Sequence, residues 1–158
     1  MAGQEIARED PRAADVQALL QRHLEFARAT TPPVYVYALD TDGLLDPAVT
    51  LFGLRRDGEL LAVGALKRLD ERHGEVKSMH TAAAARGLGA GRAMLAHLIA
   101  VARQRGYTRL SLETGSMAAF VPARSLYASA GFTECGPFGG YPGGPTSTFM
   151  TLELTGNE

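Results

Sequence analysis

The chain has 158 residues, the length of one domain with room for a sizeable hydrophobic core. Its apolar fraction of 46% and charged fraction of 21% are ordinary for a globular protein, and a net charge of −1 gives no sign of a nucleic-acid-binding or membrane-binding surface. The single Cys135 excludes a disulfide framework, and without a long apolar run or a signal peptide we expect a cytoplasmic protein with no membrane partner.

The N-terminal part predicts a short strand and a long helix. Gln4 to Arg8 predicts the strand. Asp10 fits a helix N-cap and Pro11 the first helical position, and apolar residues then repeat at helical spacing, so we expect a helix over Pro11 to Arg28. His23 lies beside the apolar stripe, which is more typical of a half-buried histidine than of a ligand. Asp40 to Gly43 has the composition of a turn.

Three strands follow in close succession. Val49 to Arg55 and Glu59 to Lys67 have strand composition, and Asp57-Gly58 between them is a strong hairpin signal. A turn near Gly74 leads into a third strand over Glu75 to Thr81. Strands joined by such short links form an antiparallel meander.

A glycine-rich turn separates the third strand from a helix over Ala93 to Arg105. Gly87, Gly89 and Gly91 free the backbone to adopt positive φ and allow another group to approach closely. The start of the helix adds unpaired amide groups and the positive end of the helix dipole. Together these features predict a seat for an anion, with phosphate as the expected occupant.

The rest of the chain predicts further alternation of strands and helices. In a strand over Thr108 to Thr114, Leu110 and Leu112 face one way, and Ser111 and Glu113 face the other. A short helix, a strand, an irregular Gly/Pro loop and a last strand follow, at residues 122–130, 132–135, 136–145 and 148–154. The element order predicts an α+β fold with a mixed, mostly antiparallel sheet flanked by helices, built as a single domain over residues 1–158.

The glycine turn does not match the two best-known phosphate loops. A P-loop needs Lys and Ser or Thr after its last glycine, whereas Arg92 follows Gly91. The spacing Gly87-x-Gly89-x-Gly91 also differs from the Rossmann fingerprint, which belongs on the first strand of its fold. Arg86-x-x-Gly89-x-Gly91 instead resembles the pyrophosphate loop of the GNAT family of N-acetyltransferases.

A second motif supports this resemblance. Ala123-x-x-Leu126-Tyr127-x-x-x-Gly131-Phe132 is similar to the A-x-x-L-Y-x-x-x-G-F motif on the family's fourth helix. One helix and one strand separate the two motifs, as they do in the family, and the resemblance covers most of the chain. The sequence departs from the family at Phe120, where an asparagine often helps to hold coenzyme A.

The resemblance implies that acetyl-coenzyme A (acetyl-CoA) is the cosubstrate and that no metal is required. It implies that the pantetheine arm pairs with the strand edge at Met79, His80 and Thr81, where one amide polarises the acetyl carbonyl. It further implies that the coenzyme's pyrophosphate is bound by the loop and the helix start, at Arg86, Gly87, Leu88, Gly89, Ala90, Gly91 and Arg92.

Acetyl transfer to an amine also needs a group that removes a proton and one that protonates the leaving thiolate. Tyr127 matches the family tyrosine regarded as the acid, with packing as its alternative role. Glu75 matches the position of the base in the histone-acetyltransferase branch, and Glu113 on the neighbouring strand competes with it. His80 ranks third, because strand alternation points it away from Glu75.

Two candidate acids and no basic cluster near the cleft predict a cationic or neutral amine acceptor, and a small molecule is the leading choice. Tyr35 and Tyr37 either line the acceptor pocket or cap the core, and the loop with Phe138 and Tyr141 either folds over the acceptor or is an inert connection. Two alternatives remain open, namely acetylation of a protein lysine or N-terminus, and a non-catalytic coenzyme A sensor. The resemblance also makes a homodimer an option, and no nucleic-acid partner is expected.

Overall fold

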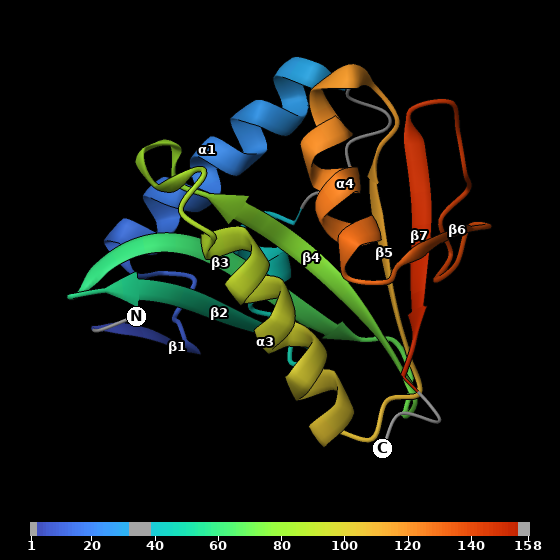
Figure 1. The fold of residues 1–158 in the computed structure, drawn as a ribbon, viewed down its shortest axis with the longest axis horizontal. Coiled ribbons are helices and arrows are strands. Elements are labelled where there is room, and N and C mark those ends of the chain that lie inside the picture. The colour runs from blue at the N-terminus through green and yellow to red at the C-terminus, as the bar shows by residue number, and fades with distance from the viewer. Residues whose placement is uncertain (1–2, 32–38, 155–158) are drawn as a thin grey trace.

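The structure, a computed structural model, describes residues 3–31 and 39–154, which form a seven-stranded sheet in the order β1-β2-β3-β4-β5-β7-β6 (Figure 1). The strands are β1 (Gln4–Arg8), β2 (Val49–Arg56), β3 (Glu59–Arg68), β4 (His73–Thr81), β5 (Arg109–Gly115), β6 (Thr133–Cys135) and β7 (Ser147–Glu153). The helices are α1 (Ala14–Thr30), α2 (Thr41–Leu44), α3 (Ala90–Gln104) and α4 (Val121–Ser129), with 3₁₀ turns η2 (Ala83–Ala85) and η3 (Ala118–Phe120). The predicted α+β fold with its mixed, mostly antiparallel sheet is confirmed.

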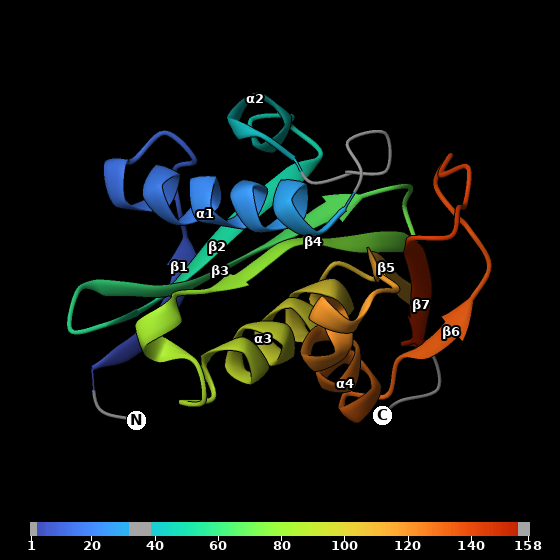
Figure 2. The same cartoon turned by 90° about the horizontal axis from the view of Figure 1, so that it is seen from above.

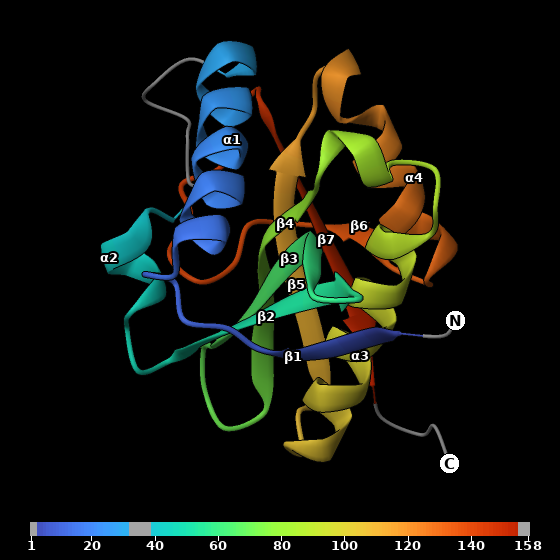
Figure 3. The ribbon, with the colours of Figure 1, turned by 90° about the vertical axis from the view of Figure 1, so that its left-hand side faces the viewer.

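Helices cover both faces of the sheet. Figure 2 shows α1 and α2 on one face and α3 and α4 on the other, and Figure 3 shows the sheet edge-on between these two layers. Side chains alternate along β3, so that Val63 and Ala65 join the core beneath α1 while Leu66 joins the core beneath α3. Both faces of the central strands are therefore apolar, which explains why their sequences are nearly continuous hydrophobic runs.

The neighbouring strands β4 and β5 are parallel and are connected through α3. Their pairing comprises four residue pairs, from His73–Arg109 to Val76–Leu112, although both strands continue further. Beyond the last pair the two strands diverge (Figure 1). As a result, the edge of residues 77–81 that faces β5 has no neighbouring strand in the described structure.

A β-bulge interrupts β4 close to the point of divergence. Val63 pairs with His80 and Ala65 with Lys77, so that one residue of β3 faces two residues of β4. One of the two is Ser78, whose φ of 57° is unusual for a residue other than glycine. The extra residue resets the side-chain alternation. His80 therefore lies on the same face as Lys77 and Glu75, and the prediction that His80 points away from Glu75 is wrong.

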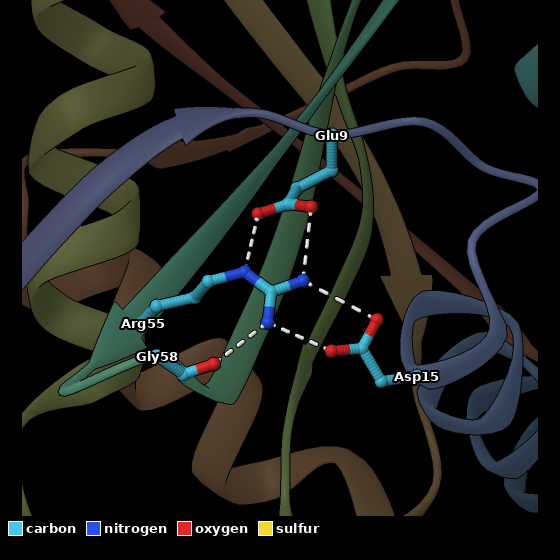
Figure 4. A network of polar contacts seen from close by, with 4 residues as sticks. All are labelled: Glu9, Asp15, Arg55 and Gly58. Atoms are coloured by element: carbon cyan, nitrogen blue, oxygen red, sulfur yellow. Dashed lines mark hydrogen bonds and ion pairs between the residues drawn. The ribbon is translucent and has the colours of Figure 1, made fainter.

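A charged network ties the start of α1 to the β2–β3 hairpin (Figure 4). The Arg55 guanidinium donates to both carboxylate oxygens of Glu9, at 2.8 and 3.1 Å, and to both of Asp15, at 2.7 and 3.3 Å. It also donates to the carbonyl of Gly58 in the hairpin turn, at 2.9 Å. The hairpin predicted at Asp57-Gly58 is confirmed, and both turn residues have the positive φ that such a two-residue turn requires.

Two predictions for the N-terminal half differ from the structure. The helix begins at Ala14 and not at Pro11, because Asp10 closes a turn in which its carboxylate accepts the backbone amide of Arg12 at 2.9 Å. Thr41–Leu44 is a short helix and not a simple turn, because the Asp40 carboxylate caps it by accepting the amide of Gly43 at 2.9 Å. Tyr35 and Tyr37 lie outside the described residues. Among the helices of the described ranges, none is both long and apolar enough to cross a membrane.

Candidate active site

A cavity of about 420 Å³ opens where β4 and β5 diverge. It is walled by side chains from α1, β4, β5, η3 and α4, and it reaches the first turn of α3. Glu75 does not line it. The predicted site residues that do line it are Met79, His80, Thr81, Arg86, Gly91, Glu113 and Tyr127. The split in the sheet therefore places the β4 edge, Glu113 and Tyr127 around one cavity. The predicted loop residues Gly87, Leu88, Gly89, Ala90 and Arg92 are not among the residues that line it.

The glycine turn leads from η2 into α3. Gly87 and Gly89 have φ values of 82° and 84°, in the left-handed region that glycine tolerates best. A Cβ on either residue would meet no atom within 4 Å, so the backbone conformation and not crowding requires glycine here. The same open space allows a ligand to approach the loop backbone closely.

The first turn of α3 adds free backbone donors. The helix begins at Ala90, earlier than predicted, with Gly89 as its N-cap, so that Gly91 lies within the first turn and not in the loop. The amide of Ala93 donates to the carbonyl of Gly89 at 3.0 Å and is the first helical donor. The amides of Ala90, Gly91 and Arg92 precede it and have no carbonyl partner within the helix. Together with the helix dipole, this arrangement fits a pyrophosphate, and the open edge of residues 77–81 fits a pantetheine arm.

Tyr127 reaches the cavity from α4, on the α3 side of the sheet. Its side chain is 7% exposed, and its ring meets that of Phe132 edge-on at 5.9 Å between centroids. Burial raises the pKa of Tyr127, and the charge of Glu113 raises it further. The phenol therefore keeps its proton at neutral pH and is available as a donor, as an acid toward a thiolate would need to be.

Glu113 reaches the cavity from β5, on the α1 side of the sheet. One carboxylate oxygen accepts the Ser147 hydroxyl at 2.8 Å. Burial raises the pKa of Glu113, while the Ser147 hydrogen bond and the charge of Lys77 act in the opposite direction. None of the ion pairs of residues 3–31 and 39–154 involves Glu113. A carboxylate with a raised pKa and no ion-pair partner is suited to accept a proton.

Glu75 has a different environment. It is 3% exposed, and its carboxylate accepts the Tyr141 hydroxyl at 2.5 Å and the Lys77 ammonium at 3.2 Å. Lys77 also donates to the Tyr141 oxygen, at 2.7 Å. Tyr141 belongs to the Gly/Pro loop between β6 and β7, whose Phe138 packs on Phe149 with 5.8 Å between ring centroids. The loop is thus attached to the sheet, and it encloses Glu75 within a closed polar cluster.

Two histidines meet at the α1 side of the cavity. The Nδ1 atoms of His23 and His80 lie 3.3 Å apart, and burial is the largest cause that lowers the pKa of each to about 4. Both rings are therefore neutral at neutral pH, with one Nδ1 as donor and the other as acceptor. The pair connects α1 to β4, and as a base it is poorly suited because its proton affinity is too low.

Lys77, Phe26, Ser147 and the contact of Tyr141 with Glu75 were not predicted. Lys77 could have been found from its position two residues after Glu75 on the same strand face, and Phe26 from its position three residues after His23 on α1. Ser147 and the contact of Tyr141 with Glu75 join segments 34 and 66 residues apart, and local sequence carries no signal for either.

Comparisons with known proteins address the fold and the family. A model of the acetyltransferase (GNAT) family matches residues 14–132. The chain belongs to the GNAT family. The predicted family and the predicted acetyl-CoA-dependent N-acetyltransferase class are therefore confirmed.

Relatives and solved structures agree with this assignment. An uncharacterized N-acetyltransferase of Bacillus subtilis, YsnE, is 45% identical over 92% of this chain and 97% of its own. An uncharacterized N-acetyltransferase of Escherichia coli, YedL, is 41% identical over 90% of each chain. The crystal structure of a putative acyl-CoA N-acyltransferase from Klebsiella pneumoniae superposes with a TM-score of 0.78 and 30% identity, covering 98% of this chain and 99% of the other.

Proposed function

We propose that this GNAT protein transfers the acetyl group of acetyl-CoA to a primary amine of a small molecule, with Glu113 as the base and Tyr127 as the acid. The observation that carries the proposal is that these two side chains line one cavity from opposite faces of the split sheet. The open β4 edge leads into the same cavity, so a thioester bound along that edge would end between them.

The coenzyme would be bound mainly by the backbone. The amides of Ala90, Gly91 and Arg92 and the open space around Gly87 and Gly89 suit the pyrophosphate. The edge at Met79, His80 and Thr81 suits the amides of the pantetheine arm. Arg86 lines the cavity and would add a charged contact.

The chemistry then needs two proton losses from the amine nitrogen and one proton gain by the leaving sulfur. Glu113 takes a proton from the acceptor ammonium, because only the neutral amine has a lone pair for attack on the thioester carbonyl carbon. A carbon–nitrogen bond forms, the carbon–sulfur bond breaks, and the electron pair of that bond leaves on sulfur. The acylated nitrogen loses its remaining extra proton to Glu113, which has released the first proton to solvent. Tyr127 gives its proton to the thiolate and is reprotonated from solvent.

Two observations favour Glu113 over Glu75 as the base. Glu113 lines the cavity, whereas Glu75 does not. The Glu75 carboxylate is also engaged by Lys77 and Tyr141, which both donate hydrogen bonds to it. A role of Glu75 in holding Lys77 and the Tyr141 loop in place is consistent with these contacts.

A small acceptor is favoured by the size of the site. Sites for small molecules commonly measure roughly 300–1,000 Å³, and this cavity of about 420 Å³ has α1 on one side and η3 with α4 on the other. A protein lysine or N-terminus would need an open groove in its place. The homodimer and the cytoplasmic location stay predictions, which size measurement in solution and cell fractionation would test.

The test is steady-state release of thiol from acetyl-CoA with a panel of amines, set beside calorimetric binding of the coenzyme. Glu113→Gln and Tyr127→Phe are expected to lower kcat by about 10²-fold or more with little change in coenzyme affinity. Glu134→Gln, on the exposed strand β6, is the matched control and should be unaffected. Tight coenzyme binding without thiol release for any amine would overturn the proposal and favour a sensor.

A further inference from the structure

Phe120 forms a wall of the cavity together with α1. Its ring meets the ring of Phe26 edge-on, with 5.3 Å between centroids, and both residues line the cavity. A Cβ at Gly115 would collide with the Phe120 ring, so the glycine on β5 makes room for it. We refer to Phe26 and Phe120 together as the aromatic wall.

The aromatic wall is accessible to a ligand. Phe26 remains 37% exposed although it contacts a second ring, which is unusual for a large apolar side chain. Ala27 of α1 and Ala119 of η3 also line this part of the cavity, and neither has a polar side chain. An apolar group placed here would bury surface on itself and on both rings.

The charged groups lie on the sheet beside this wall. Glu75 and Lys77 neutralise each other through their ion pair at 3.2 Å. Arg86 also lines the cavity, but it belongs to the loop assigned to the coenzyme pyrophosphate. Glu113 lines the cavity with a hydrogen bond from Ser147 and no ion-pair partner among the described residues, so the negative charge of its carboxylate is available to a ligand. An ammonium group would neutralise this charge, whereas a carboxylate would be repelled.

We propose that the acceptor is an arylalkylamine, a primary amine joined by a short alkyl chain to an aromatic ring. The amine lies at Glu113, and the ring packs on the aromatic wall. The inference rests on the proposed function and adds the class of acceptor to it. A polyamine fits poorly, because its additional ammonium groups would be desolvated against Phe26 and Phe120. An amino acid fits poorly, because it would bring a carboxylate near Glu113.

Binding of amines to the protein saturated with coenzyme A tests the inference without requiring turnover. The chain contains no tryptophan, so the fluorescence of tryptamine reports its own binding. Phenethylamine, octylamine and spermidine are then measured by displacement of tryptamine. Phenethylamine and octylamine have the same number of carbons, and phenethylamine should bind about threefold to tenfold more tightly because aromatic pairs add to area burial. Spermidine should bind at least about tenfold more weakly than phenethylamine.

Substitutions in the wall separate aromatic contact from general apolarity. Phe120→Leu should abolish the preference for phenethylamine over octylamine while leaving coenzyme affinity unchanged. Phe26→Leu is the second variant, in case Phe120→Leu fails to fold. Val121→Ala is the matched control, because Val121 adjoins Phe120 but is 48% exposed and does not line the cavity. Equal or tighter binding of octylamine to the unsubstituted protein, or an unchanged preference in both variants, would overturn the inference.

Failure of the inference and failure of the proposed function give different results. If phenethylamine binds preferentially but no acetyl group is transferred, the class of ligand is supported and the catalytic proposal fails. If thiol is released with all amines at similar kcat/KM, the catalytic proposal stands and the aromatic acceptor is refuted.

Discussion

The hydrogen bond from Ser147 to Glu113 predicts a measurable shift in the pH dependence of the reaction. The hydroxyl lies 2.8 Å from one carboxylate oxygen and donates to it, and this contact lowers the pKa of Glu113 against the effect of burial. Ser147→Ala removes the donor and leaves the cavity otherwise intact. Because the donor stabilises the ionised carboxylate, its loss must raise the pKa of Glu113.

The size of the shift follows from the environment of the bond. A hydrogen bond to a charged group contributes about 1.5–3 kcal/mol. Glu113 lines an open cavity, where water can partly replace the lost hydrogen bond, so we take the lower end of this energy range. Since one pKa unit corresponds to about 1.4 kcal/mol, the pKa of Glu113 should rise by about one unit. The base must be ionised, so the acidic limb of the kcat/KM profile should move to higher pH by the same amount.

The assay is kcat/KM for thiol release as a function of pH, with one amine used throughout so that ionisation of the amine contributes equally to the profile of every variant. Ser147→Thr keeps a hydroxyl and should preserve the position of the limb, and Tyr127→Phe should lower the rate without moving it. The reasoning is refuted if the limb stays in place in Ser147→Ala while Glu113→Gln removes it. Survival of the limb in Glu113→Gln would point to a different base.

Three further predictions concern stability and binding. Glu113→Gln should raise the free energy of unfolding at neutral pH and have no effect at low pH. A carboxyl group whose pKa is raised by folding makes the folded state less stable as the pH rises above the unfolded-state pKa. Chemical denaturation at both pH values checks this. Gly89→Asp should abolish coenzyme binding in calorimetry, because φ of 84° disfavours a side chain and a carboxylate would face the pyrophosphate; unchanged affinity would argue against the loop assignment. Arg55→Ala should lower the free energy of unfolding by about 1–3 kcal/mol, because it leaves Glu9 without its partner. Arg12→Ala should have a much smaller effect, because its ion pair with Asp10 is exposed. Similar denaturation midpoints for both variants would contradict this.

Local sequence determined much of this fold. The helical spacing of apolar residues on α1, the Asp57-Gly58 hairpin and the glycines before α3 each depend on neighbours within a few positions along the chain. Such features can be predicted because backbone preference and side-chain periodicity are local properties. The first and last residues of the helices and strands were predicted less well, because single hydrogen bonds decide them. Whether Asp10 caps the helix or closes a turn before it depends on one hydrogen bond, which the residue types alone leave undecided.

The environments of the two candidate bases were set by tertiary structure. Both glutamates lie on the same face of neighbouring strands, and the sequence left both as candidate bases. The strands part after Val76–Leu112, which leaves Glu113 beside the opening, while a tyrosine from a loop 66 residues further along the chain reaches Glu75. The bulge at Ser78 likewise turned His80 toward α1. The sequence has no glycine at this position that would have predicted the bulge. Contacts between distant segments set these outcomes. The free energy of packing one strand on another, or a loop on a strand, depends on both segments, so neither segment's sequence predicts it by itself.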